Sequence, residues 1–420
     1  MRACAVFLIP LLIAGGARAD AIKVGEALPL LPDGPGKGLQ ATPAVAYGRD
    51  AYLVVWREGW HGKGGSARIF AARVSKDGKV LDPRGIEVAP TGRGVQESPR
   101  VAFAGDTYLV VWQDFRNGKD YDVLATRIDV NGKVIDANPI EIAAGPRTQA
   151  LPDVAGDDKG FVVVWQGLQG EETAYRGFAA RVSTEGQVGR AVETGVTPQP
   201  RVAWNGSFFL AAGGGAGTFA GTVRSVRLNA DGQPVGKPET VIGGTKNAAF
   251  SISAAPGDGW LVISHRSMPD PWGWGGPGAI RAARVNSEGK LVNQEAAKEP
   301  AGVNRQLDSW LDLGQAKKSG GTWPWGPNAC ASDGKHVIVV WQRHHLTGEK
   351  FTNFENCDLI AARVDGFQSL DPEGIPIAVS DAEERSPALA ADRHGGLLLV
   401  YERHAANGRA SVTARVLRVE

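Results

Sequence analysis

The chain repeats one unit of about fifty residues about seven times, and this repetition limits the folds that it can adopt. The unit is clearest in residues 99–143, where a short apolar segment precedes a tight turn at 104–106 and the run YLVVW at 108–112. A polar loop then leads to a segment at 123–128, an Asn131-Gly132 turn and a last segment that ends at 140–142. This pattern predicts four short antiparallel strands, a to d, joined in sequence as a meander.

Strand b recurs along the chain as a continuous apolar run, and strand c carries an arginine in each copy. A continuous apolar run predicts that both faces of strand b are buried, because neighbouring residues of a strand point to opposite faces. We expect each arginine to bond to a carboxylate or carbonyl of the same or the next unit. The strand b copies are residues 52–56, 108–112, 161–165, 208–212, 260–263, 337–341 and 397–401, and the arginines are Arg73, Arg127, Arg181, Arg227, Arg284, Arg363 and Arg415.

A four-stranded unit whose middle strand is buried on both faces is typical of one blade of a β-propeller. We therefore predict an all-β, seven-bladed β-propeller of four-stranded antiparallel blades, formed as a single domain by residues 20–420. The last copy, residues 387–420, stops after strand c, whereas residues 22–30 resemble the strand d at 85–90. We expect the N-terminal strand to complete the last blade, which would close the ring and leave no open edge.

The repeats, seen best at residues 99–142, resemble those of exported bacterial β-propeller proteins with VVW-D-R type repeats, and the resemblance covers the whole chain after residue 19. The c–d turn at residues 75–79 is also similar to the Asp-box of sialidases, but it lacks the Thr-Trp pair that follows in that motif. The resemblance implies the propeller fold. It implies no particular activity, because propellers carry many unrelated functions.

Residues 1–19 have the pattern of a signal peptide, with Arg2, an apolar run at 5–14 and the cleavage motif Ala17-Arg18-Ala19. We therefore expect export to the periplasm or beyond, with an N-terminal anchor as the alternative. No later segment is apolar enough to enter a membrane. We also expect the protein to be a monomer. Lys plus Arg number 46 and Asp plus Glu 45, so there is no electrostatic reason to expect nucleic acid as a partner.

Cys330 and Cys357 are the two cysteines that follow the predicted signal peptide. An even number of cysteines in an oxidising compartment favours a disulfide. In the repeat alignment, however, Cys330 lies in strand a and Cys357 at the start of strand c, so two spacings of about 4.8 Å separate them. A disulfide needs Cα atoms within about 7 Å, and the sequence leaves both states open.

The long insertions of the repeat predict where a ligand binds. We expect all of them, residues 57–67, 267–278, 293–327 and 343–356, to be b–c or d–a connections. These connections meet at one face of the ring, called here the loop face, and the short a–b and c–d turns meet at the other, the turn face. Long irregular loops carry function more often than short turns. The candidate ligand-binding residues on the loop face are Glu58, Trp60, His61, Asp114, Arg116, His265, Arg266, Trp272, Trp274, Trp323, Trp325, Arg343, His344, His345, Arg403 and His404.

Two functions remain open from these residues. Aromatic faces surrounded by polar and cationic groups suit a glycan or a protein ligand, which indicates a binding propeller. The alternative is a carbohydrate-active enzyme, a polysaccharide hydrolase or lyase, that uses the same face with Glu58, Asp114 or Glu402 as its carboxylates. His265, His344, His345 and His404 could converge on a metal, but no motif of short fixed spacing supports one, so we assign neither a metal nor a cofactor.

Overall fold

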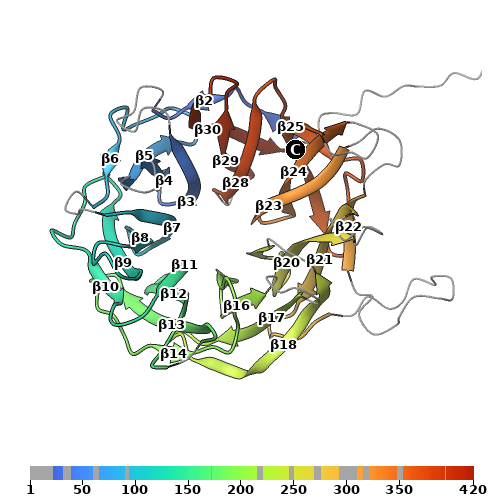
Figure 1. The fold of residues 1–420 in the computed structure, drawn as a ribbon. Coiled ribbons are helices and arrows are strands. Elements are labelled where there is room, and N and C mark those ends of the chain that lie inside the picture. Colours follow the sequence, from blue (N-terminus) through green and yellow to red (C-terminus); the bar gives the residue numbers. More distant parts are fainter. Residues whose placement is uncertain are drawn as a thin grey trace, which may run out of the picture.

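The computed structural model consists of strands and their connections. It describes residues 22–31, 39–59, 66–89, 94–171, 173–214, 221–245, 250–268, 276–292, 310–315, 322–347, 353–392 and 394–420. Within these ranges, strands β1 to β30 form seven antiparallel sheets, each a meander. Figure 1 shows the sheets arranged in chain order around a central axis, which confirms the predicted seven-bladed β-propeller.

The first four blades follow each other from the N-terminal side. Blade 1 contains β3 (Gln40–Tyr47), β4 (Ala51–Gly59), β5 (Ala67–Ser75) and β6 (Ile86–Glu87). Blade 2 contains β7 (Gln96–Ala104), β8 (Thr107–Asp114), β9 (Asp122–Asp129) and β10 (Ile140–Ala143). Blade 3 contains β11 (Gln149–Asp157), β12 (Gly160–Gly167), β13 (Arg176–Ser183) and β14 (Val192–Glu193). Blade 4 contains β15 (Arg201–Trp204), β16 (Phe209–Gly214), β17 (Gly221–Leu228) and β18 (Pro234–Thr245).

The remaining three blades complete the ring. Blade 5 contains β19 (Phe250–Ala254), β20 (Trp260–Met268), β21 (Gly276–Val285) and β22 (Trp310–Gln315). Blade 6 contains β23 (Thr322–Ser332), β24 (Val337–Thr347), β25 (Asn353–Asp365) and two short outer strands, β26 (Gln368–Ser369) and β27 (Ile375–Ala378). Blade 7 contains β28 (Glu383–Ala391), β29 (Gly396–His404) and β30 (Ala410–Val419), with β1 (Ile22–Val24) and β2 (Leu28–Pro29) outside β30.

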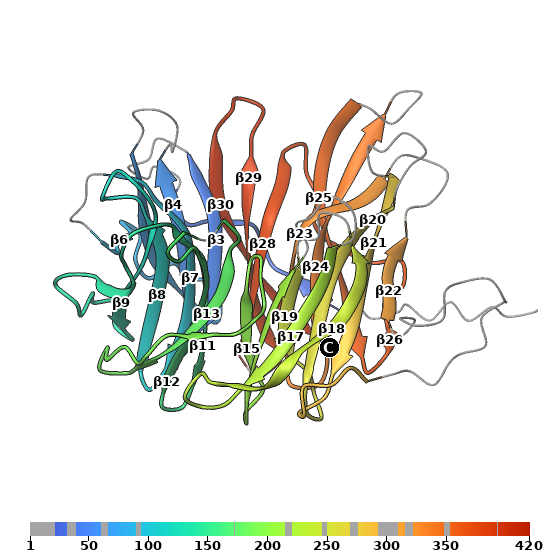
Figure 2. The same cartoon turned by 60° about the horizontal axis from the view of Figure 1, so that its bottom comes forward.

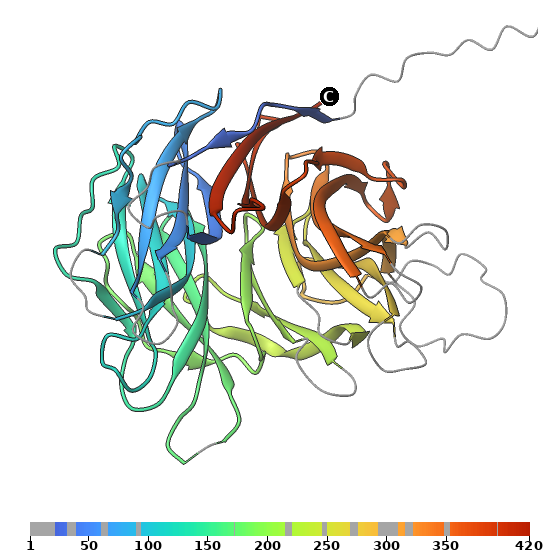
Figure 3. The same ribbon diagram turned by 45° about the horizontal axis from the view of Figure 1, so that its top comes forward.

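The two ends of the described chain meet in blade 7. β1 pairs with β30 through Ile22 opposite Val419, and the backbone N–H of Gly25 donates a 2.8 Å hydrogen bond to the carbonyl of Val416. Figure 3 shows this N-terminal segment, in blue, along the outer edge of the red C-terminal blade. The predicted closure of the ring by the N-terminal strand is therefore confirmed.

The core lies between neighbouring blades. One cluster joins Leu53 and Val55 of blade 1 to Val110 and Trp112 of blade 2, and all four side chains are fully buried. Similar clusters lie between the other neighbouring blades. Strand b is buried on both faces because each sheet is packed between two others, as its continuous apolar run predicts.

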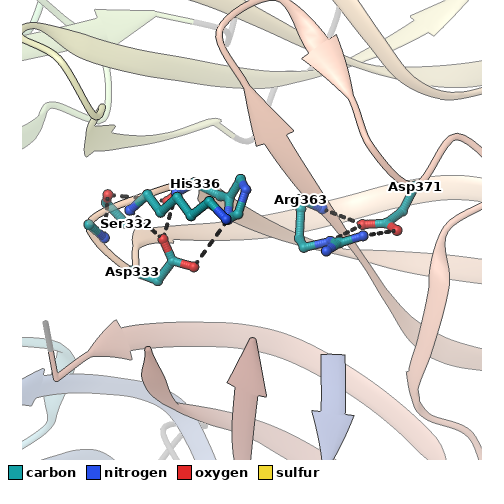
Figure 4. A network of polar contacts seen from close by, with 7 residues as sticks. Ser332, Asp333, His336, Arg363 and Asp371 are labelled. Carbon is teal, nitrogen blue, oxygen red and sulfur yellow. Dashed lines mark hydrogen bonds and ion pairs between the residues drawn. The ribbon is translucent and has the colours of Figure 1, made fainter. Parts of the chain in front are cut away.

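The strand c arginines bond as expected from the sequence. The guanidinium of Arg127 lies 2.6 Å from Oδ1 of Asp136 in its own blade and donates a 2.9 Å bond to the carbonyl of Thr184 in the next. Arg73 has the same two kinds of partner. In blade 6, Arg363 pairs with Asp371, as Figure 4 shows. These bonds tie strand c to the turn face of its own blade and, in blades 1 and 2, to that of the next one.

The a–b turn of blade 6 is fixed by one carboxylate, which Figure 4 also shows. Oδ1 of Asp333 accepts hydrogen bonds from the backbone N–H groups of Lys335 at 2.7 Å and His336 at 2.5 Å. An aspartate that bonds its own backbone two and three residues on is a common way to close a tight turn. In blade 6 this chemistry keeps the a–b turn short.

Two predictions about the insertions are wrong in position. Trp310–Gln315 forms β22, the outer strand of blade 5, so residues 293–309 connect strands c and d and not d and a. The expectation that every long insertion is a b–c or d–a connection of the loop face is therefore wrong for this one. Trp323 and Trp325 lie on β23, the inner strand of blade 6, and are not loop residues. Strand d is short and lies at the edge of each blade, so the sequence WLDLGQ carries little of the repeat pattern that marks strand b.

Cys330 and Cys357 are free thiols at the predicted places in strands a and c of blade 6. Sγ of Cys330 lies 3.3 Å from Oγ of Ser251, and Sγ of Cys357 lies 3.2 Å from the carbonyl of Glu384. The described residues include no helix long and apolar enough to cross a membrane. The predicted signal peptide, residues 1–19, lies outside the described residues.

Candidate functional site

The loop face is the upper edge of the ring in Figure 2, where β29 connects to β30. The candidate residues that the structure describes lie on or directly after strands, toward this face. The structure describes the side chains of Glu58, Asp114, Arg116, Arg343, His344, His345, Arg403 and His404. His265 and Arg266 are placed on β20, and Trp323 and Trp325 on β23, by their backbone alone. Trp60, His61, Trp272 and Trp274 lie outside the described residues.

Asp114 is buried at the end of β8, and its two oxygens are fully used inside blade 2. It accepts hydrogen bonds from Nε1 of Trp112 at 2.9 Å and from the backbone N, Nε and Nη2 of Arg116 at 2.9, 2.9 and 2.6 Å. Glu58 is the buried equivalent in blade 1, with Nε1 of Trp56 at 3.3 Å. This bonding favours a structural role for Asp114 and Arg116, which hold the end of strand b against its own loop.

A second polar position after strand b connects each of four blades to the next one. A residue in strand a of the following blade, or just before that strand in blade 4, has positive φ, and its backbone N–H is turned away from the strand ladder. A side chain next to the strand b aromatic accepts that N–H: Gln113 accepts from Leu151, Gln166 from Gln199, Gln342 from Ser386 and Glu402 from Thr42, at 2.7 to 3.0 Å. Glu402 is thus part of the contact between the last blade and the first.

His345 forms a hydrogen-bonded pair with a buried carboxylate on the neighbouring strand. Nε2 of His345 lies 2.6 Å from Oδ2 of Asp358, whose side chain is 6% exposed while that of His345 is 35% exposed. Oδ1 of Asp358 is buried and has no hydrogen-bond partner among the residues that the structure describes. His344 points to the opposite face of β24, with Nε2 3.2 Å from Nε2 of Gln342. The carboxylate therefore orients an imidazole that is open to solvent at the loop face.

His404 forms another such pair in blade 7, with a carboxylate on its own strand, β29. Its Nε2 lies 2.8 Å from Oε2 of Glu402, and its side chain is 32% exposed. Burial of Glu402 is outweighed by this bond and by the N–H of Thr42, so the pKa of Glu402 is lowered from its usual 4.5. Blades 6 and 7 thus each present one carboxylate-bound histidine at the same edge of the ring.

The charged ends of β28 and β29 surround the second pair. Glu383 lies opposite His404, Glu384 opposite Arg403, and Arg385 opposite Glu402 in the antiparallel register. Cross-strand pairs of opposite charge stabilise a sheet edge. Burial, reinforced by the charge of Asp358, raises the pKa of Glu384. This edge therefore combines cations, carboxylates and imidazoles in a short length of chain.

The described residues contain no group of three or more His, Cys, Asp and Glu side chains arranged to hold a metal ion. His345 and His404 instead each have one carboxylate partner. A carboxylate that holds an imidazole fixes its tautomer and its orientation, so these pairs can bind polar groups of a ligand or transfer a proton.

Sequence reasoning missed two cavities on the axis. One, of about 550 Å³, opens at the turn face and is lined by aromatic and charged residues that include Tyr47, Phe103, Trp204, Asp106 and His394. The other, of about 390 Å³, lies within the central channel, and most of the residues that line it belong to strand a of their blades. One feature of the sequence marks the second cavity. The residue that follows the proline of strand a is charged in three blades (Arg100, Asp153 and Arg201) but is alanine in others.

No protein-family model and no curated protein matches this chain. Solved structures with a similar fold include a protein of unknown function from Dyadobacter fermentans, at 10% identity and a TM-score of 0.49 over 96% of this chain and 100% of that one. A mutant NanB sialidase from Streptococcus pneumoniae matches at 8% identity and 0.49, over 93% and 70%. The acylaminoacyl peptidase of Pyrococcus horikoshii matches at 9% and 0.48, over 91% and 53%. At such identities and TM-scores, the likeness carries no argument about ligand or activity.

Proposed function

We propose that this protein is an exported binding propeller that recognises a glycan or protein ligand at the loop face of blades 6 and 7. The observation that supports this most directly is the pair of solvent-open histidines, His345 and His404, each held by a buried carboxylate. A binding site needs polar groups of fixed orientation that water can reach, and these two meet both conditions.

The flanking side chains fit the same role. Arg343 donates a 3.3 Å hydrogen bond to the carbonyl of Glu373 and lies opposite Asp358 in the sheet, while Arg403 lies opposite Glu384. Burial lowers the pKa of Arg343, which nevertheless stays a cation near neutral pH. Cations and imidazoles at one edge favour ligands that offer hydroxyl, carbonyl or carboxylate oxygens.

A carbohydrate-active enzyme that uses the same face is the second candidate. It is favoured by one specific contact, the 2.6 Å bond from His345 to Asp358, because a carboxylate-held imidazole is a suitable general acid or base. Asp114 and Glu58 fit this function less well, since both are buried and bonded within their own blades.

The test is a glycan array on residues 20–420, followed by affinity measurements with the glycans that bind and by pull-down of exported proteins with the same material. Substitution His404→Ala should lower the affinity at least tenfold and leave the melting temperature within about two degrees. His394→Ala is the matched control, because His394 lines the cavity on the turn face, and it should bind normally.

The results separate the candidates. Release of shorter saccharides from a bound polysaccharide, lost in His345→Ala, would favour the enzyme. Binding that His394→Ala removes and His404→Ala leaves intact would contradict the assignment of the loop face altogether.

A further inference from the structure

One layer of the propeller places a single residue from each blade around the channel at the same depth. Each of these residues lies on strand a. Six of them lie opposite the fourth residue of the strand b copy in their own blade, and Arg201 lies opposite the fifth. All seven line the channel cavity of about 390 Å³: Ala44, Arg100, Asp153, Arg201, Ser251, Ala329 and Ala388. We call this set the channel layer. The layer is small or apolar in four blades and charged only in blades 2, 3 and 4.

The charges of the channel layer do not balance. Asp153 is held by its own surroundings, since its Oδ2 accepts a 2.9 Å hydrogen bond from the backbone N–H of Val202. Its Oδ1 lies 3.7 Å from Nε of Arg100, whose Nη1 bonds to the carbonyl of Pro99 at 2.8 Å. The guanidinium of Arg201 has no hydrogen bond and no ion pair with any residue that the structure describes. The channel layer therefore has two positive charges and one negative charge, which leaves a net charge of one positive.

The two arginines also repel each other. Burial, together with the charge of Arg201, lowers the pKa of Arg100 to about 10, so Arg100 remains a cation at neutral pH. Like charges that share a partly enclosed cavity are stabilised by an anion between them. A planar guanidinium with its fork of N–H donors matches a carboxylate in particular, because two parallel hydrogen bonds can form.

The rest of the cavity limits what this anion can be. Its walls away from the arginines include Phe250, Ala329, Ala388 and Leu389, which are apolar. A volume of about 390 Å³ lies within the range of pockets that hold small organic molecules. One unpaired positive charge fits one negative charge better than the two of a phosphate near neutral pH.

We propose that the channel binds a small organic monocarboxylate, with the carboxylate between Arg100 and Arg201 and the body of the molecule against the wall of blades 5 to 7. The site uses none of the residues at the loop face, so this inference does not rest on the proposed function. A carboxylate of a free acid and one on a sugar or a chain end would be bound by the same arginines.

The experiment is isothermal titration of residues 20–420 with matched pairs of probes. Benzoate is compared with benzyl alcohol, and glucuronate with glucose, so that each pair differs in the carboxylate while the body is apolar in one pair and polar in the other. We expect either benzoate or glucuronate to bind at one site per chain and to raise the melting temperature of the protein. Benzyl alcohol and glucose should not bind. Sulfate is included as an inorganic anion.

Arg201→Gln is the decisive variant. It should lower the affinity for the carboxylate by about ten- to hundredfold, the effect of losing a charge-assisted pair. Because Arg201 has no protein partner among the described residues, the fold should keep its melting temperature or gain slightly. Lys76→Gln removes the same charge at the turn face, where Lys76 lines the other cavity, and should bind normally.

Three results would overturn the proposal. They are equal binding of a carboxylate and its neutral partner, carboxylate binding that Arg201→Gln leaves unchanged, and sulfate binding at the arginines without carboxylate binding. Arg100→Gln provides a second check if Arg201→Gln fails to fold. Loss of glycan or protein binding in His404→Ala would not affect these titrations, so the two proposals can fail separately.

Discussion

Oε1 of Glu402 accepts a 2.7 Å hydrogen bond from the backbone N–H of Thr42, a residue 360 positions earlier in the chain. The bond joins the last blade to the first, and His404 holds the other oxygen of the same carboxylate. In three other blades a neutral glutamine accepts the equivalent N–H. Of these four hydrogen bonds between neighbouring blades, only the one between blades 7 and 1 therefore has an acceptor that can be protonated.

This difference predicts a pH dependence of stability. The pKa of Glu402 is lowered in the folded protein, so its contribution is present above the usual value of 4.5 and is lost as the pH falls through the lowered pKa. Glu402→Gln should cost about 1–2 kcal/mol at pH 7 and progressively less in acid. Guanidinium unfolding at pH 7, 5, 4 and 3 measures this. Gln166→Ala should lower the free energy of unfolding by the same amount at every pH in this range. If Glu402→Gln also lowered it by a constant amount, the pH dependence inferred here would be contradicted.

Removal of residues 21–30 should destabilise the whole ring. The segment contributes β1 and β2, buries Ile22 and Leu30 at 2% exposure, and covers the edge of β30. Burial of two such side chains alone contributes about 3–6 kcal/mol, and the open edge adds a tendency to aggregate. Thermal unfolding of the truncated and the intact forms checks this. A melting temperature within two degrees of the intact form would show that the closing strand is dispensable.

Arg127→Ala and His404→Ala should have opposite effects. Arg127 bonds to Asp136 and to the next blade, so its loss should cost about 2–4 kcal/mol and leave ligand affinity unchanged. Arg176, whose ion pair with Glu193 is about half exposed on both sides, is the control, and Arg176→Ala should cost less than about 0.5 kcal/mol. Chemical unfolding together with binding assays measures both quantities. Equal stability of Arg127→Ala and Arg176→Ala would show that the repeated arginine is not structural.

The two thiols should be unreactive in the folded protein. Burial raises the pKa of both Cys330 and Cys357 to about 12, so only about one in ten thousand is a thiolate at pH 8. A thiol-specific reagent should label neither cysteine of residues 20–420 at pH 8 and both after unfolding, as counted by intact mass. If the unfolded exported protein without reductant took up no label, the cysteines would be joined in a disulfide.

The fold could be predicted from the sequence because strand b and the strand c arginine repeat almost without change. Strand d could not, since it is an edge strand of two to six residues in most blades and its sequence varies. That is why residues 310–315 were placed in a loop although they form β22. Trp323 and Trp325 were misplaced for the same reason, because β23 extends beyond the part of strand a that repeats.

The candidate site was less predictable than the fold. Asp114 and Arg116 stand out in the sequence as charged residues after strand b, but only coordinates reveal that they satisfy each other. The pairing of His345 with Asp358 links strands b and c across a connection of variable length, so no sequence spacing marks it. Arg100 and Arg201 belong to no insertion, and only the identity of their side chains distinguishes them from the equivalent residues of the other blades. The length and loop patterns that mark the loop face therefore do not mark them.

The pairing of β1 with β30 has a consequence for the order of folding. Arg415 donates a 2.8 Å hydrogen bond to the carbonyl of Gly25, 390 positions away, so the final blade needs residues from both ends of the chain. Blades 1 to 6 can form from neighbouring segments, whereas the last one must wait until the whole chain is present and a very long loop has closed. Completion of blade 7 should therefore be the slow, late step of folding, and until then β30 offers its unpaired edge to other molecules.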